Sequence, residues 1–375
     1  MRKVELAGLT GIRFYAACLV YLSHVVETIP GMGLLGGSYL IFHAGVVSVS
    51  FFFVLSGFIL TYNYADAFSV GVTVSGWKRF VCDRWARIYP MHLLAIALVM
   101  PVAIFSPNLP LDWRAVPING LLLQCWWPST TPVFMQYLNV PSWALSCEWL
   151  FYVVTPLTIY LVSHDRYRWI PLSATVLYLG GLGWMLWDGQ PDAVRLHWVS
   201  WFAPSRFVEF LAGVYLAQVF LVAPPGKLAE AAPLMQAAGI VLIIVGALYR
   251  PHATWPLWGG LLYMPGSLLL IMGLAYGRGV FVAHLSRPWL NRLGMASFAF
   301  YLIHAPMLRL AKGMCLYMGW EVQSLAMFVV VIVFLLIVIQ VAAYMACFHY
   351  EIPIQRWLRG LTGPKPLDPI LFASR

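Results

Sequence analysis

Long apolar runs separated by short polar stretches make up most of this chain. A helix needs about 20 mainly apolar residues to cross a hydrocarbon core of roughly 30 Å. Ten runs are candidates, at about residues 9–27, 44–64, 88–105, 143–162, 170–187, 204–222, 234–250, 257–276, 294–310 and 322–346. Because only helices and closed barrels satisfy their backbone groups in lipid, the pattern predicts an all-α fold, a polytopic membrane helical bundle of about ten transmembrane helices.

A further apolar run, at about residues 117–127, is too short to cross the membrane unaided. It ends in Trp126 and Trp127, and tryptophan is enriched at membrane interfaces, so we expect a re-entrant or interfacial segment. With ten spans and the amino terminus inside, sixteen lysines and arginines lie on the cytoplasmic side and six on the outer side. An eleventh span would invert all later loops against the positive-inside bias, so both termini are expected in the cytoplasm.

Composition agrees with one membrane domain. The 375 residues are 61% hydrophobic and 10% charged, and the mean hydropathy is +0.79. We expect a single transmembrane domain at residues 1–360 and an irregular cytoplasmic tail at 361–375, which holds three prolines. The net charge of +9 is spread over short loops without a continuous basic stripe, which argues against nucleic-acid binding. The six cysteines lack zinc-ligand spacing, so no metal site is expected.

The first apolar run contains two ionisable side chains, Arg13 and His24. Their offset of eleven positions is about three helical turns, so both lie on one helix face, roughly 16 Å apart along the axis. Intramembrane ionisable groups usually face the bundle interior and mark a functional path, so we expect this helix to form one wall of a site. Two structural alternatives exist: a hydrogen-bonded interfacial His24, and an Arg13 that extends to the lipid headgroups.

Six sequence blocks, each weak alone, follow one another between residue 8 and about residue 310. They are R-x10-H at residues 13–24, SFFFVLSGF at 50–58, RWARIYP at 84–90, PSWALSCEW at 141–149, RFVEFLAG at 206–213 and FYLIHAP at 300–306. With these blocks in this order, the chain resembles the acyltransferase-3 family, membrane enzymes that O-acylate carbohydrates and lipids.

The resemblance implies a membrane-bound O-acyltransferase of the bacterial inner membrane. Such an enzyme would transfer an acyl group, with acetyl the expected group, from cytoplasmic acyl-CoA to a hydroxyl of a glycan or lipid-linked saccharide. Exopolysaccharide, O-antigen, peptidoglycan and small-molecule glycosides all fit as acceptors, within exopolysaccharide or cell-envelope polysaccharide modification. Acetyl-CoA is then the donor co-substrate, and the glycan and membrane lipid are the other partners.

The resemblance also implies roles for individual residues. His24 is the general base, because a neutral imidazole can take the proton of a sugar hydroxyl as the hydroxyl attacks the thioester carbon. Arg13 is expected to contact the acyl-CoA phosphates, which suit guanidinium geometry. A cationic stretch just before the third span supplies the remaining donor-binding candidates, Lys78, Arg79, Arg84 and Arg87. Positive-inside placement against anionic lipid explains the same stretch without a ligand.

Glu148 lies about six residues into the fourth span, after a predicted Ser142 N-cap, and completes the catalytic set with His24 and Arg13. Its carboxylate can orient an imidazolium, bind acceptor hydroxyls or neutralise a cation such as Arg206. The acceptor-binding candidates are Trp143, Ser142, Trp149, Arg206 and His304. Structural alternatives exist here too: Arg206 can pair with Glu209 three residues later, and a mid-span histidine such as His304 is more often a satisfied bundle residue.

A second function class fits the same residues. Arg13, His24 and Glu148 can form the proton or anion path of a membrane transporter, and the short segment at 117–127 is typical of broken-helix carriers. No inverted repeat in the sequence supports that alternative. A non-catalytic sensor or scaffold is the third alternative, and it predicts that Arg13→Ala leaves function intact.

Overall fold

The computed structural model describes residues 6–29, 45–105, 113–126, 138–187, 198–223, 226–249, 258–320 and 322–361. Helices match the ten predicted spans: α1 (Ala7–Thr28), α2 (Gly45–Phe68), α3 (Val74–Phe105), α6 (Ser142–Val162), α7 (Ile170–Trp187), α9 (Ala203–Val222), α11 (Ala232–Tyr249), α13 (Met264–Ala275), α15 (Pro288–Tyr317) and α16 (Leu325–Ala346). By length and composition, seven helices among these ranges can span a membrane, and three shorter apolar helices match the other predicted spans. The predicted all-α membrane bundle is thereby confirmed.

Shorter elements connect these helices or follow them. They are α4 (Ala115–Gly120), α10 (Gly226–Glu230), α12 (Trp258–Leu261), α14 (Val280–Leu285), the π-helical turn η3 (Cys347–Glu351) and α17 (Ile352–Leu361). The segments α16, η3 and α17 follow one another without a break, so the last helical stretch continues to Leu361. The predicted irregular tail starts where α17 ends, and residues 362–375 lie outside the described residues.

The third helix differs from its prediction. Helix α3 begins at Val74 rather than near residue 88, so residues 78–87, predicted just before the third span, lie within the same helix as that span. Thr73 Oγ1 accepts a hydrogen bond from the Gly76 backbone N–H at 3.1 Å, which supports the earlier start. The two inner arginines of the stretch, Arg84 and Arg87, make polar and aromatic contacts inside the bundle.

The predicted short segment is confirmed as one that does not span the membrane. Residues 115–120 form α4, and turns continue to Trp126. Ser146 of α6 holds these turns, because its Oγ donates to Leu122 O at 2.7 Å and Trp126 Nε1 donates to Ser146 O at 3.0 Å. Leu122 and Cys125 are fully buried, so the segment packs into the bundle.

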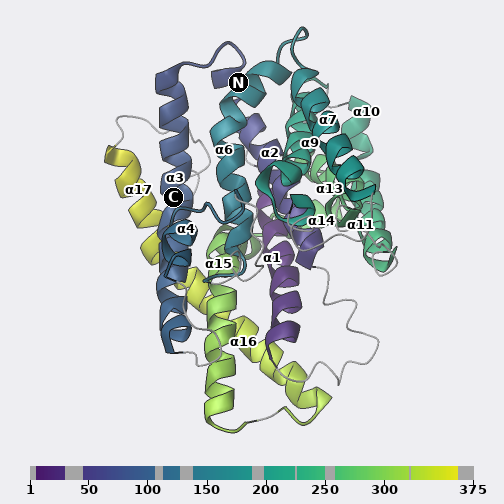
Figure 1. Cartoon of the computed structure of the whole chain (residues 1–375). Coiled ribbons are helices and arrows are strands. Elements are labelled where there is room, and N and C mark those ends of the chain that lie inside the picture. The colour runs from purple at the N-terminus through teal and green to yellow at the C-terminus, as the bar shows by residue number, and fades with distance from the viewer. Residues whose placement is uncertain are drawn as a thin grey trace.

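Close helix crossings set the frame of the interior. Gly57 of α2 and Gly213 of α9 lie at one crossing, where a Cβ added to Gly213 would come 1.9 Å from Val54 O. Gly294 of α15 approaches α1 almost as closely, since Thr10 O would lie 2.1 Å from its Cβ position. Small residues permit such close approach of helix backbones. In the resulting bundle, α7, α10 and α11 lie on the side opposite α3 and α17 (Figure 1).

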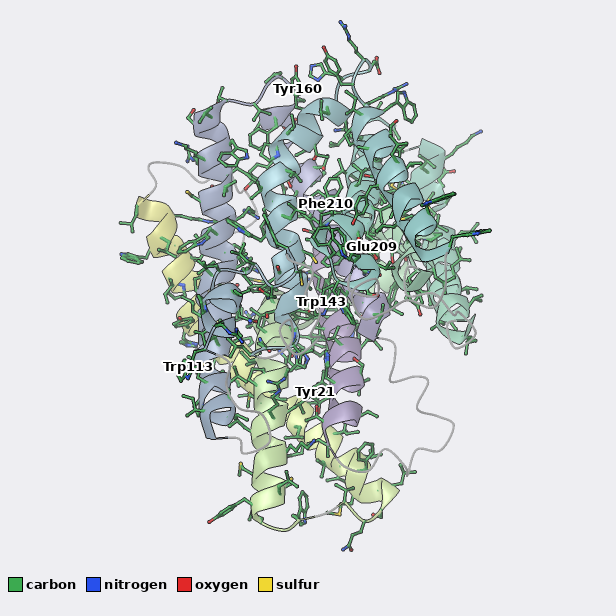
Figure 2. All side chains as sticks on the ribbon, viewed as in Figure 1. Tyr21, Trp113, Trp143, Tyr160, Glu209 and Phe210 are labelled. Carbon is green, nitrogen blue, oxygen red and sulfur yellow. The ribbon has the colours of Figure 1, made fainter. Side chains whose placement is uncertain are left out.

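Aromatic side chains fill the space between the central helices. The ring centre of Phe151 lies 5.2 Å from that of Phe53 and 5.0 Å from that of Phe210, and all three side chains are fully buried. Figure 2 shows Phe210 and Trp143 among the central helices and Trp113 at the edge of the bundle, where it is exposed. This packing joins α2, α6 and α9 and forms one side of the interior where the candidate site lies.

Candidate active site

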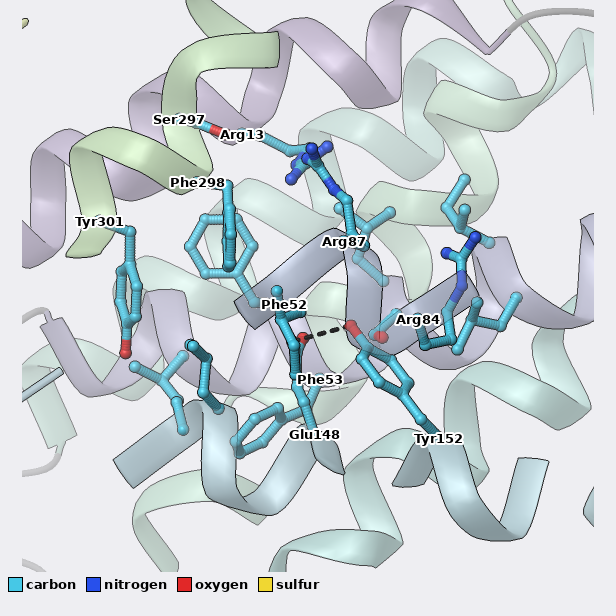
Figure 3. A pocket seen from close by; sticks show the side chains of 18 of the residues that line it. Arg13, Phe52, Phe53, Arg84, Arg87, Glu148, Tyr152, Ser297, Phe298 and Tyr301 are labelled. Carbon is cyan, nitrogen blue, oxygen red and sulfur yellow. Dashed lines mark hydrogen bonds between the residues drawn. The ribbon is translucent and has the colours of Figure 1, made fainter. Parts of the chain in front are cut away.

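A cavity of about 210 Å³ lies among α1, α2, α3, α6 and α15 (Figure 3). Its apolar wall consists of aliphatic side chains and the rings of Phe52, Phe53, Phe298 and Tyr301. Its polar lining groups are Thr10, Arg13, Ser56, Arg84, Arg87, Glu148, Tyr152 and Ser297. Three predicted donor-binding arginines and the predicted catalytic carboxylate therefore share one space, although they come from three different helices.

Two of the arginines, both from α3, are held by the surrounding protein. Arg84 donates to the Tyr64 hydroxyl at 3.0 Å, and its guanidinium carbon lies 5.5 Å from the centre of the same ring. Arg87 forms an ion pair with Glu351 of η3, and its guanidinium carbon lies 5.2 Å from the Phe298 ring centre. These contacts fix both side chains at the edge of the cavity.

Arg13 differs from these two arginines. Within the described ranges, no hydrogen bond or ion pair holds its guanidinium, which lines the cavity from α1. Its charged neighbours are Arg87, which repels it, and Glu148 and Glu351, which attract it. Figure 3 shows the guanidinium groups of Arg13 and Arg87 close to one another. Two neighbouring guanidinium groups suit an anionic ligand that both can bind, because each can donate charge-assisted hydrogen bonds to the same oxyanion.

Glu148 supplies a single carboxylate to the described lining of the cavity. Tyr152, one helical turn further along α6, donates to Glu148 Oε2 at 2.9 Å. The cations that Glu148 faces are Arg13, Arg87 and Arg84. The cations nearest to Glu148 are thus the cavity arginines and not Arg206, and the described lining, with three guanidinium groups and one carboxylate, keeps a net positive charge.

Arg206 lies in a separate buried cluster. Its Nη2 donates to Glu209 Oε1 at 3.0 Å, and Ser50 Oγ donates to the same oxygen at 2.6 Å. The guanidinium carbon lies 5.4 Å from the Phe53 ring centre and 5.7 Å from the Trp143 ring centre. Arg206 is 6% exposed and does not line the cavity. The ion pair that the spacing predicts is therefore present within α9, and the hydrogen bond from Ser50 to Glu209 links it to α2.

His24 and His304 form a pair next to the cavity. His304 Nε2 lies 3.0 Å from His24 Nδ1, and the ring centres are 5.1 Å apart. His304 is fully buried, whereas His24 is partly exposed. Neither histidine lines the cavity, but Tyr301 does, and its ring centre lies 6.0 Å from that of His304. The cavity that begins at Arg13 therefore ends short of His24, and Tyr301 contacts both the cavity and the histidine pair.

Ser142 is buried, and the prediction that it caps α6 is wrong. The helix begins at Ser142 itself, and Pro141 occupies the cap position without a side-chain hydrogen bond. The Ser142 Oγ instead donates to Asn139 O at 2.7 Å, and Gln124 Nε2 donates to that Oγ at 3.1 Å. These contacts connect the start of α6 to the short segment rather than to the cavity.

Four further predicted residues also lie outside the cavity lining. Trp143 and Trp149 are partly buried and pack against the hydrophobic core on either side of Glu148 along α6. Lys78 is exposed and Arg79 is partly buried, both in the first turns of α3. Of the predicted donor-binding residues, the structure thus brings together Arg13 and the two inner arginines of α3.

The structure adds two residues that the sequence analysis missed. Tyr152 lies four positions after Glu148, and side chains four apart meet on a helix face, so this pair was accessible to sequence reasoning. Glu351 is fully buried and pairs with an arginine 264 positions earlier, which no local pattern indicates. Among the described residues, no group of three or more histidine, cysteine or carboxylate side chains gathers as metal ligands would.

The helical membrane bundle, the cationic cavity and the motif blocks around it define an integral membrane acyltransferase. The chain belongs to the acyltransferase-3 family, since the family model described as an acyltransferase domain matches residues 6–345. The acyltransferase MdmB of Streptomyces mycarofaciens is 32% identical over 328 residues, which cover 82% of this chain and 80% of that protein.

Two further relatives carry names that refer to glycans. The exopolysaccharide production protein ExoZ of Rhizobium meliloti is 29% identical, and the match covers 70% of this chain and 76% of ExoZ. The peptidoglycan O-acetyltransferase OatA of Listeria monocytogenes is 24% identical, and the match covers 71% of this chain and 45% of OatA. No solved structure matches the chain.

Proposed function

We propose that this acyltransferase moves an acetyl group from cytoplasmic acetyl-CoA to a hydroxyl of a glycan or lipid-linked saccharide. The reaction would serve exopolysaccharide or cell-envelope polysaccharide modification in the bacterial inner membrane, with both termini of the chain in the cytoplasm. The observation that carries this proposal is the cationic cavity, in which Arg13, Arg84 and Arg87 outnumber the carboxylate of Glu148.

The cavity suits the donor in charge and in shape. Coenzyme A bears phosphates, and guanidinium groups bind phosphate oxygens through paired charge-assisted hydrogen bonds. Arg13 has no hydrogen-bond or ion-pair partner among the described residues and can make such bonds, while protein contacts hold Arg84 and Arg87 in place. A cavity of about 210 Å³ is smaller than typical ligand pockets of about 300–1,000 Å³, so it would hold only the narrow part of the donor.

The glycan acceptor rests on the relatives and on the chemistry of His24. ExoZ is named for exopolysaccharide production and OatA for peptidoglycan O-acetylation, and both acceptors offer sugar hydroxyls. A sugar hydroxyl is a weak nucleophile until a base takes its proton, and His24 is the partly exposed member of the histidine pair. We assign His24 as that base and Tyr301 as the side chain between it and the donor cavity.

The orientation follows from the distribution of positive charge. Lysines and arginines are concentrated in the segments that follow even-numbered predicted spans and at both ends of the chain, which favours a cytoplasmic location for those segments. In this orientation the Arg13 end of α1 is near the cytoplasmic face, where acetyl-CoA is available, and His24 is nearer the opposite face.

Release of free coenzyme A by the purified protein in lipid nanodiscs, with acetyl-CoA and an extract of cell-envelope saccharides, tests the proposal. Acceptor-dependent release that is lost in His24→Ala and reduced in Arg13→Gln supports it. The exposed Arg292 of α15 supplies the control variant, Arg292→Gln, which should behave as the wild type. Flux of labelled acetyl-CoA or protons into vesicles without acceptor-dependent coenzyme A release would instead support the transporter alternative and overturn the proposal.

A further inference from the structure

We infer that His304 is a positioning residue that fixes the tautomer of His24 and so keeps one nitrogen of His24 free to act as a base. This inference rests on the proposed role of His24 and assigns a separate role to a second histidine. The pair joins α1 and α15 across 280 positions of sequence, with His304 Nε2 3.0 Å from His24 Nδ1.

The hydrogen bonds of His304 assign its proton. His304 Nδ1 lies 3.3 Å from Phe300 O, one helical turn earlier in α15. A carbonyl oxygen only accepts hydrogen bonds, so Nδ1 is the nitrogen that carries hydrogen. A neutral imidazole has one N–H, and His304 Nε2 is therefore the acceptor. His304 is thus able to receive a hydrogen bond from His24 but not to donate one.

The same reasoning assigns the proton of His24. Since His304 Nε2 accepts, His24 Nδ1 carries the hydrogen of the bond between them, and the backbone carbonyl of Val20, one helical turn earlier, is a second acceptor beside the His24 ring. Neutral His24 then has a lone pair on Nε2, the nitrogen that the pair leaves unused. In the other tautomer Nε2 would carry hydrogen and could not take a proton. The hydrogen bond made by one ring nitrogen thus determines whether the other nitrogen carries hydrogen, and so whether that other nitrogen can act as the base.

Burial separates the roles of the two histidines. His304 is 0% exposed, and its ring contacts the rings of Phe300 and Tyr301 at centre distances of 6.1 Å and 6.0 Å. These aromatic neighbours hold the ring in place, and substrate has no direct access to it. His24 is partly exposed, so it is the member of the pair that a hydroxyl can reach.

The chemical step can be written with every proton placed. His24 Nε2 takes the proton of the acceptor hydroxyl while the oxygen forms a bond to the thioester carbonyl carbon. The carbon–sulfur bond then breaks, the electron pair leaves with sulfur, and His24 returns the proton to give the free thiol. While His24 holds that proton it is an imidazolium, and its Nδ1–H continues to donate to His304 Nε2. His304 stays neutral throughout.

Substitutions at His304 test this role because glutamine and asparagine reproduce different nitrogens of histidine. In His304→Gln, the side-chain amide can place its oxygen near the original Nε2 and accept from His24. In His304→Asn, the amide is one methylene shorter and reaches only the original Nδ1 position. His304→Leu removes all polar atoms. In nanodiscs, with acetyl-CoA and cell-envelope saccharides, we expect kcat to fall about 10–100-fold in His304→Asn and His304→Leu, with KM for acetyl-CoA unchanged.

The matched variant and a double substitution complete the test. His304→Gln should keep kcat within about fivefold of wild type, and His304→Leu should cause no further loss in a His24→Ala background, because both act on one base. Equal activity of His304→Gln and His304→Asn would overturn the inference. If His24→Ala itself retains full activity, the proposed function fails. If His24→Ala is inactive and His304→Asn is fully active, only the positioning role fails.

A second measurement reads the tautomer directly in the wild-type protein. Nitrogen NMR of the wild-type protein with isotope-labelled histidine reports which ring nitrogen carries hydrogen. We expect a His24 signal with protonated Nδ1 and unprotonated Nε2, identified by its loss in His24→Gln. The opposite tautomer in the resting protein would overturn the inference.

Discussion

Replacement of Arg13 by glutamine should weaken binding of acetyl-CoA without weakening the fold. Arg13 lines the cavity, and no partner among the described residues holds its guanidinium, so the bonds that it can form are those to a ligand. Hydrogen bonds to charged groups contribute about 1.5–3 kcal/mol each, and 1.4 kcal/mol is about tenfold in affinity. Loss of one phosphate contact should therefore raise the Kd for acetyl-CoA about 10–100-fold.

Most substitutions of buried side chains destabilise the fold, but Arg13→Gln should leave the stability unchanged or increase it. Arg13 and Arg87 repel one another, and within the part of the chain that the structure describes no carboxylate pairs with the partly buried Arg13 guanidinium. Arg13→Gln removes both unfavourable contributions and loses only longer-range attraction to Glu148 and Glu351. The melting temperature in detergent should stay the same or rise.

Isothermal titration of purified protein with acetyl-CoA, together with thermal unfolding, checks both parts. Arg13→Lys keeps the charge but lacks the planar guanidinium, so its Kd should lie between those of wild type and Arg13→Gln. The exposed Arg292→Gln should leave both quantities unchanged. Wild-type affinity in Arg13→Gln, or a large fall in its melting temperature, would refute the reasoning.

Three other substitutions probe the cavity and the bundle. Glu148→Gln makes the cavity more positive, so titration should show acetyl-CoA bound as tightly as in wild type or more tightly, while turnover falls; weaker binding would contradict this. Gly213→Ala places a Cβ 1.9 Å from a backbone oxygen of α2 and should destabilise the bundle by about 1–3 kcal/mol, whereas Gly313→Ala, with open space around it, should not, as thermal unfolding can show. Glu209→Gln leaves a buried guanidinium without its carboxylate and should lower stability by about 3–5 kcal/mol, while Asp165→Asn in an exposed pair should cause no measurable change; equal melting temperatures of these two variants would contradict the assignment.

Local sequence patterns were sufficient to predict the helices and part of the candidate site. Apolar length predicts the spans because every residue of a lipid-facing helix meets the same apolar solvent. The pattern is less reliable where a helix carries charges that face the interior. The charges of Arg84 and Arg87 placed this stretch ahead of the predicted third span, yet their side chains line a cavity and the helix begins at Val74.

The partners of the candidate residues depend on tertiary structure. Arg13, Arg87 and Glu148 stand in separate motif blocks, and only the packing of α1, α3 and α6 places them around one cavity. The face shared by Arg13 and His24 follows from helical periodicity, but the partner of His24 on α15 does not. Pairing between distant segments leaves no periodic signal in one sequence, so such contacts required the structure.

The central claim is that the cavity between α1, α3 and α6 binds the acyl donor. The most direct measurement is the structure of the protein in nanodiscs with coenzyme A bound. We predict that phosphate oxygens of coenzyme A contact the guanidinium of Arg13 and at least one of Arg84 and Arg87, with the thiol directed toward Tyr301. Coenzyme A bound on another face of the bundle, with no contact to Arg13, would contradict the account.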